Sequence, residues 1–406
     1  MPPRLSHRKS TKGCQRCKAR KVKCDEQQPK CSHCKRHGVS CEYLSLATRA
    51  YVPSQISKAT SQRSSQPGPT SGLGSPDMGA LRIMDLRLMH HYTTQTAQTM
   101  SSAQLPSVGA MWSMTVPQMA FEYLPLLHTL LAIGAAHRST MVPGEANKLR
   151  PVHHGYIDSS LQRHRALTSH VTGPEVESVC INAILISLYT MFLRTEPSTG
   201  PYEPPILWLS VARGVRVILQ SVYWTLLNSK SSLCPLFFAQ PSIWNKDPNC
   251  TFHDLPTKPF QFLLHYRREE EEWCNETSEA YSRSVGYLEM MFLAVSGEQP
   301  DSVIRRILNG FPPMVPSQFM HLASERRPRA LVILAYLFAM AKTSEDMWWL
   351  KGTPGREVHG IDSILPIEWK WAMSWPLRLI SASPETRCYE IPLPVTCSPP
   401  SPASTV

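Results

Sequence analysis

The sequence contains no hydrophobic run long enough to cross a membrane. Its longest uninterrupted apolar run, from Leu331 to Ala341, is far shorter than the roughly 20 residues that a membrane helix needs. The first residues are charged and have no apolar core, so we expect no secretory signal peptide. These absences predict an intracellular protein with no membrane span.

The sequence also lacks the short motifs by which many enzymes are recognised. It contains no G-x-S-x-G elbow, no phosphate-binding loop and no H-E-x-x-H motif. No pair of carboxylates stands out, because the acidic run from Glu269 to Glu272 is typical of a solvated helix face. We therefore predict no catalytic residues. An enzyme with a zinc module as its tether remains a remote alternative.

What the sequence does contain is a dense group of cysteines. Six of its twelve cysteines follow the spacing C-x2-C-x6-C-x6-C-x2-C-x6-C, and the second half repeats the first 17 residues later. The six residues are Cys14, Cys17, Cys24, Cys31, Cys34 and Cys41. Each C-x2-C pair places two thiols close enough to share a metal ion, so we predict that all six are metal ligands.

The number of thiols predicts two zinc ions. A structural zinc ion takes four ligands in a tetrahedron, so two ions need about eight ligand positions. Six thiolates fill these positions only if two of them bridge both ions. Three symmetry-related pairs could bridge, and the spacing does not choose among them. A disulfide framework is the alternative, but it is unusual inside cells and does not explain the repeat.

The positive charge is concentrated in the same segment. The whole chain has a formal net charge of +11, and residues 1–43 hold 12 Lys and Arg against three acidic residues. The basic side chains fall mainly in the first half of the cysteine segment, which we expect to face a polyanion. This pattern is typical of nucleic-acid binding. A thiol-rich zinc store, another alternative, would not need these cations.

The cysteine segment resembles the fungal binuclear zinc cluster of transcription factors related to the galactose regulator. The resemblance rests on the spacing, the basic run and Pro29 between the halves. It implies two Zn(II) ions bridged by Cys14 and Cys31. It also implies a nuclear protein that acts with the transcription machinery on RNA polymerase II promoters.

The same resemblance implies roles for four basic residues in binding double-stranded DNA. Lys21 matches the lysine that reads a CGG-type triplet in the major groove, where a lysine contacts guanine O6 and N7. Arg20 stands where the family uses a backbone carbonyl. Lys18 and Lys23 would hold phosphates, which position the module without specifying sequence.

Composition divides the chain into five parts. We predict a small zinc-stabilised α module and an all-α C-terminal domain joined by a disordered linker, because strand alternation is absent and residues after 43 become rich in Ser, Gln, Gly and Pro. The parts are a basic arm at 1–13, the zinc cluster at 14–43, the linker at 44–79, a helical regulatory domain at 80–382 and a disordered tail at 383–406.

The helical domain carries a second resemblance. Residues 81–100, Trp112 and the apolar helix from Leu124 to His137 resemble the sterol uptake control regulators. We predict a pathway-specific regulator, for example of a secondary-metabolite gene cluster. The resemblance implies an alternative, a sterol-responsive regulator of lipid genes whose helical domain binds a small apolar ligand. The ligand-binding residues are unknown, and we expect histidines 90, 91, 128 and 137 to serve in packing or capping.

Two further expectations concern the architecture of the helical domain. The linker has no leucine heptad, so any dimer must form through the helical domain rather than through a coiled coil. The segment from Ile206 to Leu227 is apolar on nearly all sides, which predicts a central helix.

Overall fold

In a computed structural model the chain forms two compact units, Met1–Leu73 and Gly74–Val406. In the first unit the structure describes residues 14, 16–17, 20, 22, 24–27, 30–37, 39 and 41. In the second it describes residues 78–167, 175–198, 200–228, 231, 233, 236, 258–265, 271 and 273–383. All regular structure in these residues is helical, which confirms the predicted fold class. The predicted arm lies outside the described residues, as do nearly all of the linker and tail.

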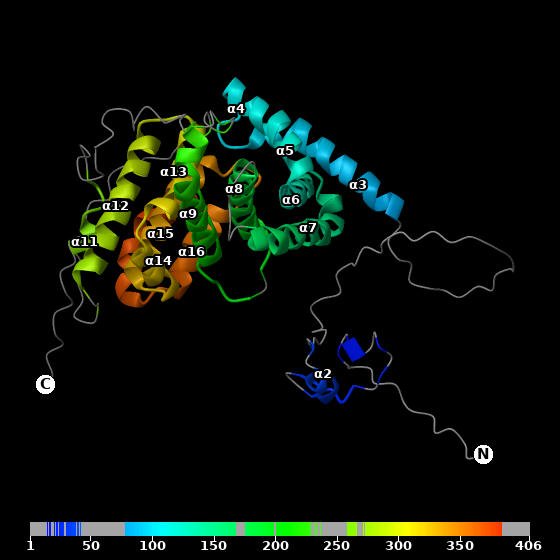
Figure 1. The fold of residues 1–406 in the computed structure, drawn as a ribbon. Helices are drawn as coiled ribbons and strands as arrows, with labels where there is room; N and C mark the ends of the chain where they lie inside the picture. The colour runs from blue at the N-terminus through cyan, green and yellow to red at the C-terminus, as the bar shows by residue number, and fades with distance from the viewer. Residues whose placement is uncertain are drawn as a thin grey trace, which may run out of the picture. The chain divides into compact units, whose positions relative to one another are not determined.

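The second unit consists of helices of very different lengths (Figure 1). Its α-helices are α3 (Met78–His91), α4 (Pro106–Ala110), α5 (Val116–Glu122), α6 (Leu124–Met141), α7 (Ala146–Leu167), α8 (Val176–Phe192), α9 (Ile206–Asn228), α11 (Phe262–His265), α12 (Asn275–Ser296), α13 (Asp301–Met314), α14 (Ser317–Ser324), α15 (Pro328–Ala341), α16 (Thr353–Ile364) and α17 (Ser374–Ser381). Short π- and 3-10 turns connect several of them, such as η1 (Tyr92–Thr96), which continues α3.

Helix α15 forms the centre of this unit. Every residue from Arg329 to Ala341 is buried, and the helix packs against α12, α13, α14, α16 and α17 (Figure 1). A helix that is apolar on all sides must be covered on all sides. The apolar run noted in the sequence is therefore the core helix of the domain.

The prediction that the Ile206 to Leu227 segment is central is wrong. Helix α9 exposes Leu207 and Val217, with Ser210, Gly214 and Ser221 completing one exposed stripe. These positions recur at three- and four-residue steps, the period of one helix face. The apolar composition hid this stripe because two of its members are large hydrophobic residues.

Helix α8 and the 3-10 turn that follows it (Leu193–Thr195) are long and apolar enough to cross a membrane by length and composition. Most of this stretch is buried, and α8 packs against α6 and α9. Protein covers the apolar side chains, so α8 is a second core helix.

A close approach between α3 and α6 depends on Gly134. A Cβ atom at this position would lie 2.8 Å from the carbonyl oxygen of Leu88. The backbones of the two helices can approach this closely because glycine has no side chain.

Candidate metal centre and nucleic-acid interface

Both halves of the cysteine segment begin with a helical turn. In the first half the Arg20 N–H donates to the carbonyl of Arg16 at 3.1 Å. In the second half Cys31 is the N-cap of helix α2 (Ser32–Arg36), and its sulfur accepts the N–H of Cys34 at 3.4 Å. A helical turn brings residues three apart onto one face, so each C-x2-C pair directs both thiols to the same side.

The six sulfur atoms converge into two overlapping groups of four. Within each group all four sulfurs lie within 4.8 Å of one another, and the groups are Cys14, Cys17, Cys24 and Cys31, and Cys14, Cys31, Cys34 and Cys41. Cys14 and Cys31 belong to both groups. The spacing left three pairs open as the shared one, and in the structure the pair of first cysteines takes this position.

The sulfur separations fit tetrahedral zinc. The Sγ atoms of Cys14 and Cys31 lie 3.8 Å apart, and those of Cys17 and Cys31 lie 3.7 Å apart. A tetrahedron with Zn–S bonds of about 2.3 Å has edges of ~3.8 Å. All six cysteines are free thiols, so the disulfide alternative does not describe this segment.

Backbone hydrogen bonds repeat between the halves. The N–H of Cys14 points to the sulfur of Cys24 at 3.4 Å, and the N–H of Cys31 points to the sulfur of Cys41 at 3.2 Å. Equivalent residues therefore make equivalent contacts, as the 17-residue repeat requires. N–H donors favour the thiolate, the form that binds zinc.

The surroundings shift the thiol pKa values in both directions. The Cys34 N–H lowers the pKa of Cys31, and the Cys31 N–H lowers that of Cys41. Removal from solvent raises the pKa of Cys34 to about 12. A positive ion at the centre would offset this desolvation, because a coordinating thiol is deprotonated outright.

A polar loop joins the two halves. The carboxylate of Asp25 accepts the N–H of Ser32 at 3.1 Å, and the Ser32 hydroxyl donates to the side-chain oxygen of Gln27 at 3.2 Å. The hydrogen bond from Ser32 lowers the pKa of Asp25. These contacts tie the end of the first half to the start of α2.

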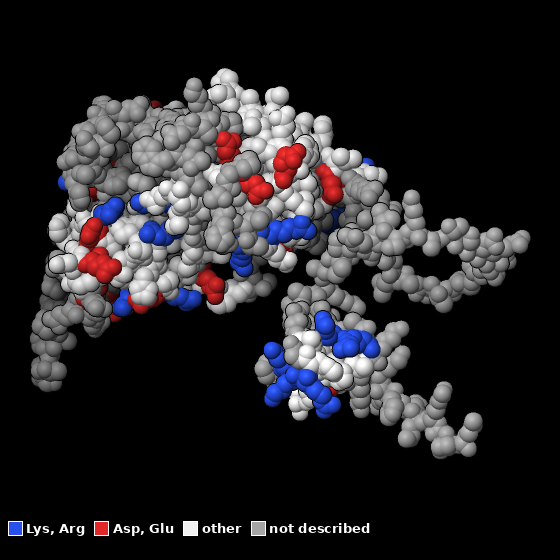
Figure 2. Space-filling view, viewed as in Figure 1, with Lys and Arg blue, Asp and Glu red and all other residues white. Residues whose placement is uncertain are grey.

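Exposed cations surround the sulfur cluster. Figure 2 shows Lys and Arg side chains gathered on this unit, and the described ones are all exposed: Arg16, Arg20, Lys30, Lys35 and Arg36. The second half therefore also presents positive charge, through Lys35 and Arg36. Of the four predicted DNA contacts, Arg20 is described, whereas Lys18, Lys21 and Lys23 lie outside the described residues.

Of the histidines singled out in the sequence, His137 packs inside the helical domain. His137 Nδ1 lies 2.9 Å from the Thr96 hydroxyl, and its ring stacks on Trp348. Burial lowers the pKa of His137 to about 4 and also lowers that of His128. His90 lies exposed on α3.

Each unit contains a segment that matches a known protein family. Residues 12–50 match the family described as the fungal Zn(2)-Cys(6) binuclear cluster domain, and residues 87–195 match the fungal specific transcription factor domain. A Zn(2)-C6 fungal-type transcription factor, afumD of Aspergillus fumigatus, is 33% identical over 85% of this chain and 88% of its own length.

Two other relatives differ in how much of this chain they match. A Zn(2)-C6 fungal-type transcription factor of Gibberella zeae is 29% identical over 93% of this chain and 87% of its own length. Sterol uptake control protein 2 of Candida albicans is 27% identical over 35% of this chain and 20% of its own length. The similarity to the first two spans nearly the whole chain, and the similarity to the third spans one part of it.

Proposed function

The chain belongs to the Zn(2)-C6 fungal-type transcription factors, and from this premise we propose that it controls the genes of one pathway by binding their promoters. Family membership confirms the resemblance drawn from the cysteine spacing. It makes the chain a DNA-binding transcription regulator that holds two zinc ions. A family of transcription factors implies a role in regulation rather than in catalysis.

In this proposal the six thiolates would hold the two zinc ions, and Cys14 and Cys31 would each be shared by both. The observation that carries it is the pair of overlapping sulfur groups, in which Cys31 lies 3.8 Å from Cys14 and 3.7 Å from Cys17. Zinc supplies the cross-links that a segment of this size needs in place of a hydrophobic core. The Asp25 and Ser32 contact then orients one half against the other.

The charged surface would bring the module to DNA. Exposed lysines and arginines release counterions when they neutralise phosphates, and this term supplies affinity without sequence preference. We assign Lys18 and Lys23 to these phosphate contacts, and Arg20 to the position where the family uses a backbone carbonyl. Lys21 would read a guanine of a CGG-type half-site through O6 and N7, which is a direct source of specificity.

The proposal also concerns which genes the protein regulates. Similarity to two Zn(2)-C6 factors extends along nearly the whole chain, which favours a regulator of the same kind. We propose a pathway-specific regulator, for example of a secondary-metabolite gene cluster. The site of action would be the nucleus, and a dimer would form through the helical domain.

A second candidate is a sterol-responsive regulator of lipid genes. The partial similarity to sterol uptake control protein 2 favours it. That similarity covers only 35% of the chain, so we rank a sterol ligand below pathway-specific regulation by other means.

Genome-wide occupancy of the tagged protein tests the proposal. We expect peaks at the promoters of one contiguous gene set, centred on CGG-type half-sites, and their loss in Cys14→Ala. The matched control is Cys274→Ser, which changes an exposed cysteine at the N-cap of α12 and should keep the peaks. Peaks at sterol-synthesis promoters would favour the second candidate, and peaks that persist in Cys14→Ala would contradict the zinc-dependent mechanism.

A further inference from the structure

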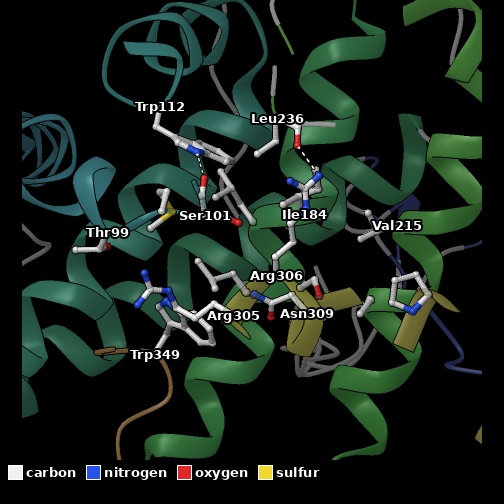
Figure 3. Close-up of a pocket in the computed structure, with 16 residues that line it drawn as sticks. Thr99, Ser101, Trp112, Ile184, Val215, Leu236, Arg305, Arg306, Asn309 and Trp349 are labelled. Carbon is white, nitrogen blue, oxygen red and sulfur yellow. Dashed lines mark hydrogen bonds between the residues drawn. The ribbon is translucent and has the colours of Figure 1, made fainter. Parts of the chain in front are cut away.

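A partly open cavity lies in the helical domain, between segments that are far apart in the sequence (Figure 3). Helices α8, α9 and α13 contribute to its walls, together with residues 99–101, Trp112, Leu236 and Trp349. In the view of Figure 3, Trp112 and Leu236 lie on one side, and Trp349 and Asn309 lie on the other. The cavity therefore connects elements that local sequence does not hold together.

Most of the wall is apolar. Ile184, Leu185 and Leu188 of α8 and Ala212 and Val215 of α9 line it. An apolar body placed here loses its contact with water, which favours binding.

Two indole rings complete the apolar part. Trp112 and Trp349 are both nearly fully buried. The Trp112 indole N–H donates to the carbonyl of Ser101 at 3.0 Å, which fixes the orientation of the ring (Figure 3). Aromatic walls of this kind suit a flat ring, because aromatic pairs gain energy beyond the area that they bury.

Helix α13 supplies positive charge to the wall. Arg305, Arg306 and Asn309 all line the cavity, and Arg305 and Asn309, four residues apart, share a helix face. The Arg306 guanidinium also donates to the carbonyl of Leu236 at 3.4 Å, which holds it at the wall. The described lining contains these two cations and no Asp or Glu.

Arg305 has no fixed anionic partner within the described part of the chain. No described carboxylate forms an ion pair with it, whereas Arg194 and Arg329 each pair with a glutamate. A guanidinium offers five N–H donors in a planar fork that matches a carboxylate. An acidic ligand would therefore meet positive charge and hydrogen-bond donors where Arg305 lines the cavity.

The volume limits the size of the ligand. The cavity measures about 170 Å³, and an engineered cavity of about 150 Å³ in another protein binds benzene. One ring with a short side chain fits a space of this size. A four-ring sterol is several times larger than benzene, so most of it would remain outside.

We propose that this cavity binds a small organic acid with one aromatic or branched apolar group, whose carboxylate contacts Arg305 and Asn309. This inference deepens the regulatory role proposed for the helical domain. Such a ligand links α8, α9 and α13 through one molecule. The proposal concerns this domain alone, and its test involves no DNA, so its failure leaves zinc-dependent DNA binding untouched.

Calorimetric titration of the full-length zinc-loaded protein tests the proposal. The probes are benzoate and 3-phenylpropionate, with 3-phenylpropanamide as the uncharged match and ergosterol as the sterol. We expect at least one acid to bind, and 3-phenylpropionate to bind roughly tenfold more tightly than its amide, because charge-assisted hydrogen bonds are about twice as strong as neutral ones. Ergosterol should not bind in the cavity.

Three variants locate the site. Arg305→Gln should weaken acid binding roughly tenfold and leave amide binding unchanged. Val215→Phe should abolish binding of both, because the larger side chain fills the space. Arg283→Gln is the matched control, since Arg283 is exposed on α12 and pairs only weakly with Glu279 at 3.5 Å. Thermal unfolding without ligand checks that each variant folds.

Each result of these titrations either supports or overturns the proposal. Selective loss of acid binding in Arg305→Gln, with Arg283→Gln unchanged, would support the proposal. Equal binding of acid and amide, equal effects of the two arginine variants, or no binding of either acid would overturn it. Ergosterol binding that Val215→Phe abolishes would also overturn it and would favour a sterol ligand.

Discussion

The sulfur atoms of Cys14 and Cys31, equivalent residues of the two halves, lie 3.8 Å apart, and each belongs to both groups of four thiols. No other cysteine of the cluster occupies both groups. We expect this arrangement to give the six residues unequal importance, although the sequence pattern presents them alike. A bridging thiol contributes to two metal sites, and a terminal thiol contributes to one.

Substitution of a bridging cysteine should therefore cost more zinc than substitution of a terminal one. We expect Cys31→Ala to retain no stoichiometric zinc, because both tetrahedra lose a ligand. Cys24→Ala should retain about one ion, because only one tetrahedron is incomplete. Native mass spectrometry of the intact chain counts the bound ions, and Cys274→Ser should keep both. Equal zinc loss in Cys31→Ala and Cys24→Ala would contradict a bridging role.

Lys21 should determine sequence preference and not only affinity. We expect Lys21→Ala to weaken binding to the preferred site by about 1–3 kcal/mol and to relax the preference at one base pair. Lys35→Ala, which removes an exposed cation from α2, should weaken binding to all sequences about equally. Competition binding against a randomised duplex pool measures both effects. A uniform loss in Lys21→Ala would make this residue a phosphate contact.

The stability of the helical domain should fall as the pH falls from about 6.5 to 4. Burial lowers the pKa of His137, His153 and His164 to about 4 each, below the unfolded value near 6.5. Between these values the unfolded chain binds more protons, so the stability present above pH 6.5 is lost on acidification. Thermal unfolding across this range should show a shallower slope for His137→Gln than for His359→Gln, which changes an exposed residue of α16. Identical slopes for the two variants would contradict the attribution of this pH dependence to His137.

Gly134 should be required for the contact between α3 and α6. The new Cβ of Gly134→Ala would lie 2.8 Å from the Leu88 carbonyl, so the helices must separate, at a cost of about 1–3 kcal/mol. Gly155→Ala in α7 is the matched control, because its Cβ meets nothing within 4 Å. This control should stabilise the fold by roughly 0.5–1 kcal/mol, since alanine favours helix interiors. Denaturant unfolding compares the two, and equal changes would argue against close packing.

The sequence predicted the metal centre and the fold class because both depend on local patterns. Cysteine spacing predicted a set of six ligands, but it left three bridging pairs open, since the choice depends on how the halves fold together. The family resemblance pointed to Cys14 and Cys31, the pair that the structure places in both sulfur groups. Helical periodicity identified the class of the second domain without any single motif.

Features that depend on tertiary packing escaped prediction. Composition made α9 look central, but its stripe with Leu207 and Val217 faces solvent, and α15 takes the centre instead. The cavity is lined by residues from Thr99 to Trp349. No local pattern connects positions so far apart, so only the folded chain reveals that Arg305 and Trp112 share one space.

Binding of a duplex with a CGG-type half-site, before and after zinc removal, tests the central claim most directly. The full-length protein is titrated with a labelled duplex by fluorescence anisotropy, and far-UV circular dichroism follows the helices. We predict that chelation abolishes specific binding, that added Zn(II) restores it, and that the helical domain keeps its signal throughout. Unchanged specific binding after verified removal of both ions would contradict the account.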